Sequence, residues 1–410
     1  MEVITNSQGI FCIYVCVSAG SIYEEPNEAG MSHVLEHMLL KRTKRYSESL
    51  LITKLAEMGG ITNATTDKDM TCYFVYTVSD NWRQAVDIMA SVVREMDIRA
   101  SELEKEKRVI VEEINMRRDR YMDLYNLAVS SILSKSNPYS KHVEGTPAKV
   151  LALTRSRLAS YYKKTYGTYM VLANCPPAIK DKVRSYMSSR FGKHDRPIPS
   201  PPVGPDAYRH GVYVVNRDKS QYTHVISFPT YPKTEHRKNV ITNFIRFAVI
   251  NGSFKSRMMY ILRTRLALLY HISSSNDVYR DLGILNIEAS TTTNNLMKIL
   301  SVFVAVVKRI QAHGLTPKEL RFFKKAYLSN KSLVFANEEF RTSWHAENHF
   351  YGCSISEKQY TDYIKNITND DIIGVSREVL DFGRMGVLSF GRYKNPRRDA
   401  KALYDYVMSL

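Results

Sequence analysis

The order of apolar and polar residues divides the chain into segments typical of strands and helices. In the first half, short runs rich in β-branched and aromatic residues predict strands at 9–19, 70–78 and 169–174. Apolar residues that return every three or four positions predict helices over 47–58, 82–96, 101–134 and 155–165, with a further helix that ends near Arg190. This half therefore reads as an α+β domain.

The second half repeats this order of elements. Strands are predicted at 211–215, 223–228, 268–273, 282–289 and 386–390, and long helices at 296–313 and 317–335, with a final helix at the end of the chain. Between the halves, residues 196–205 contain five prolines, which favour an extended connector over a helix or central strand. The sequence predicts two α+β domains, 1–195 and 207–410, joined by a linker at 196–206.

Composition adds limits to this picture. The 410 residues, 44% of them hydrophobic, are too many for one ordinary core. No apolar run approaches the roughly 18–20 residues of a membrane helix, and the first residues lack the pattern of a secretory signal. The five scattered cysteines form no CxxC pair and favour a reducing compartment over a disulfide framework. We therefore expect an intracellular, soluble protein, located in the cytoplasm.

The charge is strongly basic, with 58 Lys and Arg residues against 41 Asp and Glu residues, a formal net charge of +17. The basic residues are spread along the chain and no nucleic-acid-binding motif accompanies them. A solvated basic surface is the plainer interpretation, and we do not expect nucleic acid as a partner. Binding of a polyanion stays an alternative function.

Candidate chemistry begins with His33, Glu36 and His37, spaced as HxxEH in a segment of helical pattern. At about 100° per residue, the two histidines lie roughly 40° apart and one turn from each other, so both rings can reach one metal ion. Glu36 lies about 60° to the other side of His33, where it can face the same site and take a proton from water. Two histidines packed in a core are the alternative.

A zinc site of this kind needs another protein ligand, and hydrolytic sites commonly use a carboxylate. Glu106 and Glu113 are seven positions apart, two turns along one face of a predicted helix. Either could ligate the metal while the other supports the site.

These residues belong to a longer resemblance. The spacing of 75 residues between His37 and Glu113 is similar to that in the M16 metallopeptidases, the group of insulysin, pitrilysin and the mitochondrial processing peptidase. The resemblance also includes, in chain order, the segments Ala19-Gly-Ser21, Lys41-Arg-Thr43, Gly60-Ile-Thr-Asn-Ala-Thr-Thr66, Thr71-Cys-Tyr73, Asn137-Pro-Tyr139, Glu144-Gly-Thr146 and Leu262-Arg-Thr-Arg-Leu-Ala-Leu-Leu-Tyr270. The resemblance covers essentially the whole chain and is most specific in the first 150 residues.

The resemblance implies a role for each matching position. His33, His37 and Glu113 would hold one Zn²⁺ per chain, with Glu36 as general base and Glu106 as a supporting carboxylate. The segment Asn63-Ala64-Thr65 resembles the family's edge strand, which receives the substrate as an added strand. Arg263 and Tyr270 resemble a pair that holds the peptide and stabilises the oxyanion, although Ala267-Leu-Leu-Tyr270 departs from the family's usual Gly-Leu-Ala-Tyr.

The fold and function follow from the same resemblance. It implies two homologous halves, each a mixed sheet packed with helices, arranged as a clamshell in the M16 fold. It also implies a zinc endopeptidase that cleaves peptides or unfolded segments in an enclosed chamber, as a homodimer or with a paralogue. A catalytically silent structural subunit is the alternative within this fold. A second histidine pair, His345 and His349, has Glu347 on the opposite side and is interpreted as an ordinary helix face.

Overall fold

The chain forms two compact units in the computed structural model, which describes residues 1–119, 128, 132–192, 208, 211–217, 221–292 and 295–409. Unit 1 comprises Met1–Arg120, Lys141–Pro202 and Val334–Ser354, and unit 2 comprises Tyr121–Ser140, Val203–Leu333 and Ile355–Leu410. Each unit therefore includes a segment from the other half of the chain. The predicted linker at 196–206 lies outside the described residues, so the domain limits at 195 and 207 stay predictions.

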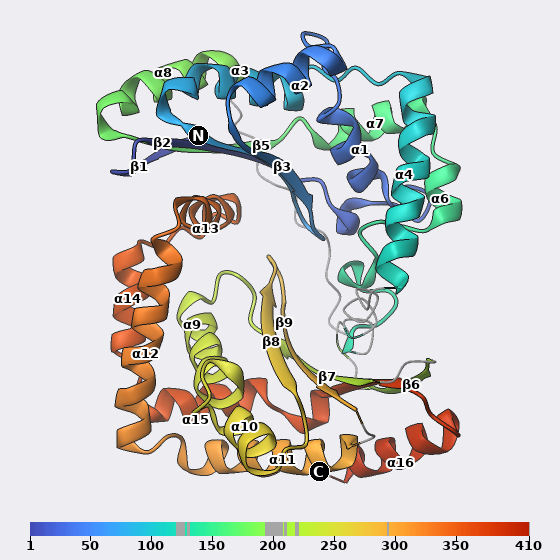
Figure 1. Ribbon diagram of the computed structural model, residues 1–410, viewed down its shortest axis with the longest axis vertical. Coiled ribbons are helices and arrows are strands. Elements are labelled where there is room, and N and C mark those ends of the chain that lie inside the picture. Colours follow the sequence, from blue (N-terminus) through green and yellow to red (C-terminus); the bar gives the residue numbers. More distant parts are fainter. Residues whose placement is uncertain are drawn as a thin grey trace. The chain divides into compact units, whose positions relative to one another are not determined.

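Unit 1 is built on a five-stranded mixed sheet (Figure 1). Its strands are β1 (Glu2–Thr5), β2 (Ile10–Val17), β3 (Gly60–Thr66), β4 (Thr71–Val78) and β5 (Tyr169–Cys175). Their order is β1-β5-β2-β4-β3, in which only β1 and β5 are parallel. The four-residue β1 lies at one edge and β3 at the other.

The helices of unit 1 cover both faces of this sheet. They are α1 (Met31–Leu39), α2 (Glu48–Glu57), α3 (Trp82–Arg94), α4 (Ala100–Asp119), α6 (Pro147–Leu151), α7 (Arg155–Thr165), α8 (Lys180–Phe191) and α13 (Glu338–Phe350). Phe11, Ile13 and Val15 of β2 face the main core with α3, whereas Tyr14 and Cys16 face α13. Burial of both faces explains why β2 is apolar at almost every position.

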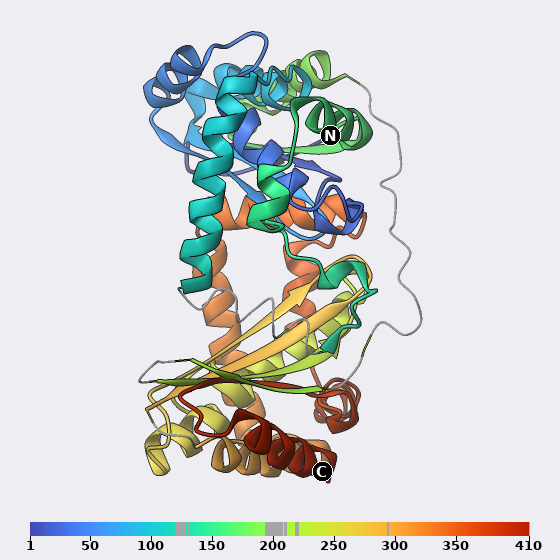
Figure 2. The same ribbon diagram turned by 90° about the vertical axis from the view of Figure 1, so that its right-hand side faces the viewer.

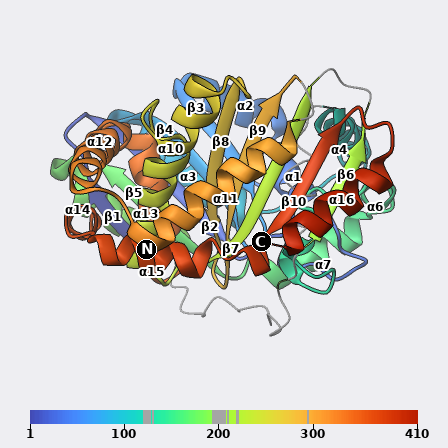
Figure 3. The same cartoon turned by 90° about the horizontal axis from the view of Figure 1, so that it is seen from below.

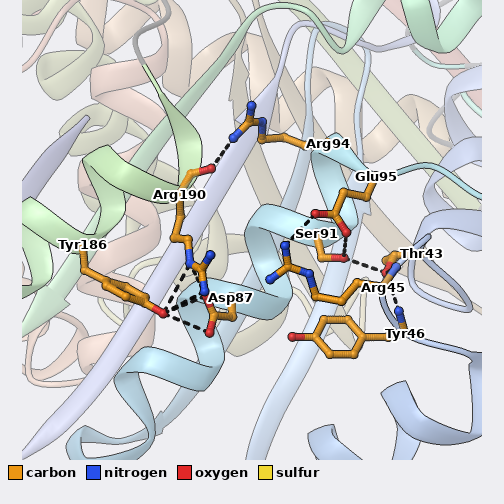
Figure 4. A network of polar contacts seen from close by, with 9 residues as sticks. All are labelled: Thr43, Arg45, Tyr46, Asp87, Ser91, Arg94, Glu95, Tyr186 and Arg190. Carbon is orange, nitrogen blue, oxygen red and sulfur yellow. Dashed lines mark hydrogen bonds and ion pairs between the residues drawn. The ribbon is translucent and has the colours of Figure 1, made fainter.

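Polar contacts join α3 to its neighbours in unit 1 (Figure 4). Ser91 Oγ lies 2.6 Å from Thr43 Oγ1 and 3.0 Å from a carboxylate oxygen of Glu95, and the contact with Thr43 ties the segment after α1 to α3. Tyr186 of α8 donates to Asp87 of α3 at 2.9 Å. These contacts hold the segment after α1, and also α8, against α3.

Unit 2 repeats the sheet order of unit 1. Its strands are β6 (Gly211–Asn216), β7 (Tyr222–Thr230), β8 (His271–Val278), β9 (Gly283–Thr291) and β10 (Gly386–Gly391), in the order β6-β10-β7-β9-β8. Again one edge pair, β6 and β10, is parallel and the other pairs are antiparallel. The predicted fold class, two α+β halves with mixed sheets, is confirmed.

The helices of unit 2 enclose a second apolar core. They are α9 (His236–Ile245), α10 (Arg257–Met259), α11 (Leu296–His313), α12 (Pro317–Phe335), α14 (Glu357–Lys365), α15 (Asn369–Val379) and α16 (Pro396–Met408). Figure 3 shows α11 and α16 lying across the strands of this unit. The shorter helical segments of the two units are Ser21–Tyr23, Ser79–Asn81, Pro138–Ser140, Pro177–Ile179, Arg246–Asn251, Tyr260–Arg265 and Phe382–Arg384.

Most predicted elements are observed within a few residues of their expected ends. The strand predicted at 268–273 instead begins at His271, because helical structure continues through Tyr260–Arg265 and Ala267 then adopts a positive φ of 48°. The helix predicted over 101–134 is described as far as Asp119, and most of its remainder lies outside the described residues.

The sequence favoured a reducing compartment over a disulfide framework, but one disulfide is present among the described residues. Cys16 of β2 and Cys72 of β4 form a disulfide, because strand pairing places them directly opposite each other with Cα atoms 4.1 Å apart. Cys12, Cys175 and Cys353 are buried and belong to no disulfide among the described residues.

Within the described residues, no single helix has the length and apolar composition of a membrane span. Taken together, α11 and α12 have that length and composition, but they are bent by 105° at their junction. The apolar face of α11 packs in the core of unit 2.

Arg257 and Glu319 form an ion pair in unit 2 whose contribution to stability depends on pH. Arg257 donates to both carboxylate oxygens of Glu319, at 3.0 and 2.8 Å, and this lowers the pKa of Glu319 from 4.5 to about 2. A carboxylate with a lowered pKa stabilises the fold above about pH 4.5, and this contribution is lost as pH falls toward 2.

We expect Glu319→Gln to lower the free energy of unfolding by about 2 kcal/mol at pH 7, a value reduced because the side chain is 31% exposed. The difference from wild type, measured by urea titration at several pH values, should shrink as pH falls from 4.5 to 2. Asp405→Asn on the exposed side of α16 is the control and should show no such trend. A difference that does not change over this range would contradict the assignment.

Candidate metal centre

The helix that carries the HxxEH residues is anchored at its first turn. Gly30 precedes α1 with a φ of 92°, and a Cβ atom there would lie 2.8 Å from the carbonyl oxygen of Glu144. The buried carboxylate of Glu24 accepts hydrogen bonds from the backbone N–H groups of Gly30 and Ser32, each at 2.8 Å. Glu24 thus does what an N-cap side chain usually does and positions the turn that contains His33.

Helix α4 lies beside α1 (Figure 2). This packing brings Glu113 to the two histidines. The Nε2 atoms of His33 and His37 are 3.3 Å apart. Glu113 Oε2 lies 3.8 Å from His33 Nε2 and 3.4 Å from His37 Nε2. Ligand atoms of a tetrahedral zinc ion, at bonds of about 2.0–2.1 Å, are separated by roughly 3.3–3.4 Å, so these three side chains fit such an ion. No other group of three such side chains in the described part of the chain meets this test.

Glu106 supports this cluster from two turns before Glu113 on α4. Its Oε1 lies 2.9 Å from His37 Nδ1, and its Oε2 lies 2.6 Å from Lys41 Nζ. Burial alone would raise the pKa of Glu106, but the hydrogen bonds from His37 and Lys41 lower it. The contact at Nδ1 fixes the orientation of the His37 ring and leaves Nε2 facing Glu113.

Glu113 is held in turn by Arg117, one turn later on α4. The guanidinium lies 2.7 Å from Glu113 Oε1 and also contacts Glu144, in the loop that packs on Gly30. The hydrogen bond to His37, together with the charges of His33 and Arg117, lowers the pKa of Glu113 to about 2. Oε1 therefore pairs with Arg117 while Oε2 faces the histidines.

The two histidines have opposite pKa shifts. Burial and the neighbouring His37 lower the pKa of His33 to about 4. Burial would also lower the pKa of His37, but hydrogen bonds to Glu106 and Glu113 raise it to about 9. A metal ion ligated by His37 would take the place of its second proton, because only the neutral ring can ligate, and the carboxylates that raise the pKa of His37 would equally favour that cation.

Glu36 lies on the same helix and contacts the neighbouring strand. Its Oε2 accepts a hydrogen bond of 2.6 Å from the hydroxyl of Thr66, the last residue of β3. Burial raises the pKa of Glu36, against the opposing effects of Thr66 and His37. The raised pKa favours proton transfer near neutral pH.

The strand residues predicted to bind substrate lie on β3, which pairs with β4 on one side and ends the sheet on the other. Ala64 is buried, whereas Asn63 and Thr65 are exposed. The backbone N–H and C=O groups on the outer side of an edge strand can pair with another extended segment.

Arg263 and Tyr270 lie together in unit 2. The guanidinium of Arg263 is 5.7 Å from the centre of the Tyr270 ring and 5.3 Å from that of Phe254. Tyr270 is 80% exposed. The two residues predicted as a pair are therefore neighbours.

The second histidine pair does not form a metal cluster. On α13, His349 lies 3.0 Å from Glu2 of β1, and the ring of His345 packs edge-on against Trp344. Three residues of the metal centre had no role in the sequence prediction: Glu24, Thr66 and Arg117. Thr66 belongs to the segment that carried the family resemblance, and Arg117 follows Glu113 at the spacing of one helical turn.

Comparisons with known proteins agree with this architecture. The family described as "Insulinase (Peptidase family M16)" matches residues 3–147, and the family described as "Peptidase M16 inactive domain" matches residues 152–327. An uncharacterized zinc protease of Rickettsia felis is 24% identical over 377 residues, covering 90% of this chain and 89% of that protein. An uncharacterized zinc protease of Mycobacterium tuberculosis is 27% identical over 392 residues, covering 93% of this chain and 88% of that protein.

Solved structures show the same fold. The crystal structure of a protease from Helicobacter pylori superposes with a TM-score of 0.84 at 19% identity, over 95% of this chain and 96% of that one. The structure of a peptidase M16 inactive domain from Pseudomonas fluorescens has a TM-score of 0.83 at 15% identity, over 95% of each chain. The matches to both M16 domains, over most of the chain, show that this protein belongs to the M16 peptidase family.

Proposed function

We propose that this protein is a zinc-dependent endopeptidase with one Zn²⁺ per chain. The observation that carries the proposal is the cluster of His33, His37 and Glu113, whose three ligand atoms lie within 4.8 Å of one another. The names of its relatives, zinc proteases, support the choice of metal. When bound, zinc would supply Lewis acidity, which polarises a peptide carbonyl and lowers the pKa of water.

The side chains of unit 1 divide the work around this ion. Glu36 takes the proton from the attacking water and delivers it to the leaving amine, a role that suits a carboxylate with a raised pKa. Glu106 keeps the His37 ring in its ligating orientation, and Arg117 does the same for Glu113.

The substrate would be a peptide or an unfolded segment that adds to β3 beside Asn63, Ala64 and Thr65. Strand addition uses backbone hydrogen bonds and makes few demands on substrate sequence. Arg263 and Tyr270 would hold the peptide and stabilise the oxyanion. The proposal also includes cleavage of the peptide inside an enclosed chamber and assembly of the protein as a homodimer.

Metal removal tests the proposal directly. We expect wild type to contain about one zinc ion per chain and to cleave a mixed pool of unfolded peptides, with activity lost on chelation and restored by zinc. His33→Ala should lose both zinc and cleavage, whereas the control His345→Ala on α13 should retain both. Zinc content and mass spectrometry of the products are the measurements. Full cleavage by metal-free protein would contradict the proposal.

Two alternative functions predict different results. A catalytically silent subunit would cleave nothing, with or without zinc. A polyanion-binding protein that uses the charge of +17 would bind nucleic acid with an affinity that falls steeply with salt.

A further inference from the structure

Glu36 makes an asymmetric set of contacts in unit 1. Its Oε2 accepts the hydroxyl hydrogen of Thr66 at 2.6 Å. Among the described residues, no side chain or backbone group donates a hydrogen bond to Oε1. Oε1 is also absent from the set of fully buried polar atoms that lack a hydrogen-bond partner. One oxygen is thus held by the protein while the other stays free for a proton.

The position of Thr66 is itself fixed by the sheet. Thr66 pairs in register with Thr71, the first residue of β4. The hydroxyl of the fully buried Thr71 donates to the carbonyl oxygen of Ala19 at 2.9 Å and lies 3.5 Å from the hydroxyl of Thr66. A β-branched residue in a paired strand has few rotamers, so the Thr66 hydroxyl is a stiff donor.

We infer that Thr66 is a positioning residue for Glu36, and that through it the peptide-receiving strand β3 sets the orientation of the catalytic carboxylate. This inference rests on the proposed function, since it concerns the same site. Thr66 directly follows Asn63-Ala64-Thr65, the residues proposed to pair with substrate. The hydrogen bond therefore connects the strand that binds the peptide to the group that moves the proton.

The energetic consequence concerns the chemical step rather than binding. A charge-assisted hydrogen bond that holds Oε2 keeps Oε1 directed for proton transfer. Without this hydrogen bond, the Glu36 carboxylate samples other rotamers and forms hydrogen bonds with water in place of the one from Thr66. Backbone pairing along β3 does not use the Thr66 hydroxyl, so peptide affinity should be unchanged. The loss should appear in kcat and not in KM.

The test compares Thr66→Val with Thr66→Ser. Valine keeps the shape of threonine and removes the hydroxyl, whereas serine keeps the hydroxyl. We expect Thr66→Val to lower kcat about 10- to 100-fold with KM within about twofold of wild type. Thr66→Ser should recover kcat to within about threefold. The control Thr165→Val removes a buried hydroxyl that bonds to Tyr161 on α7, and it should keep the wild-type kcat.

Zinc affinity, measured by competition with a chelator, provides a readout apart from activity. It should be unchanged in Thr66→Val, because Thr66 contacts none of the three proposed ligands. A tenfold loss of zinc affinity would mean that the substitution damages the cluster, and it would overturn the inference.

A double-mutant cycle separates this inference from the proposed function. If Thr66 acts through Glu36, Thr66→Val should have no further effect on the residual rate of Glu36→Gln. Independent, multiplicative losses, or a wild-type kcat for Thr66→Val, would overturn the inference while leaving the peptidase in place. Failure of the proposed function would instead appear as a wild type that does not cut, or as a Glu36→Gln variant that cuts at the wild-type rate.

Discussion

We expect Glu36→Gln to lower kcat for peptide cleavage by about a thousandfold while the protein keeps its zinc. Glutamine has the size of glutamate, and its carbonyl oxygen can still accept the hydrogen bond from Thr66. Its amide cannot take a proton from water or return one to the leaving amine. The loss therefore falls on the chemical step, and KM should stay close to that of wild type.

The measurements are zinc content and steady-state kinetics on an unfolded peptide. Glu112→Gln provides a matched control, because this exposed glutamate lies on α4 next to Glu113 and has no role in the proposed mechanism. We expect wild-type kinetics for it. If Glu36→Gln also cuts at the wild-type rate with zinc bound, Glu36 is not the general base.

Glu24→Ala should have the largest effect on stability. Glu24 is 2% exposed and accepts two backbone hydrogen bonds at the first turn of α1. Burial raises its pKa to about 7, so at pH 8 the carboxylate is ionised and can accept both bonds. Alanine leaves two buried N–H groups without acceptors, which we expect to cost about 3 kcal/mol in the free energy of unfolding.

This effect should extend to the metal centre, because Ser32 directly precedes His33. Urea unfolding and zinc competition at pH 8 should both report the change. The neighbouring Glu25 is exposed, and Glu25→Ala should change the free energy of unfolding by less than about 0.5 kcal/mol. Glu24→Gln should be intermediate, since one acceptor remains. Equal stability of the Glu24→Ala and Glu25→Ala variants would contradict this role for Glu24.

Much of the fold could be predicted from local patterns. The strands near Ile10–Val17 and Thr71–Val78 and the helices Leu296–His313 and Pro317–Phe335 lie within a few residues of their predicted ends. These elements bury an apolar run or an apolar face, and that requirement is visible in a short window of sequence. The assignment of α13 to unit 1 could not be predicted this way, because an amphipathic helix does not identify the sheet that its apolar face covers.

The pairing of segments that are distant in the sequence could not be predicted from local patterns either. Cys16 and Cys72 are 56 positions apart, and only the register of β2 against β4 places them opposite each other. A shift of that register by one residue would have moved them to opposite faces of the sheet.

The sequence alone determined the positions of His33, Glu36 and His37 relative to one another, because helix geometry converts their spacing into a shared face. Helix geometry left open which carboxylate of α4 meets the histidines, since Glu106 and Glu113 lie on the same side of that helix, and only the family resemblance assigned Glu113 as the ligand. Tertiary structure decided this through the packing of α4 on α1, which sets Glu113 against the Nε2 atoms and Glu106 against Nδ1 of His37. It also decided the contacts of Glu24, Thr66 and Arg117, which join separate loops, strands and helices. Such contacts produce no periodic pattern in the sequence.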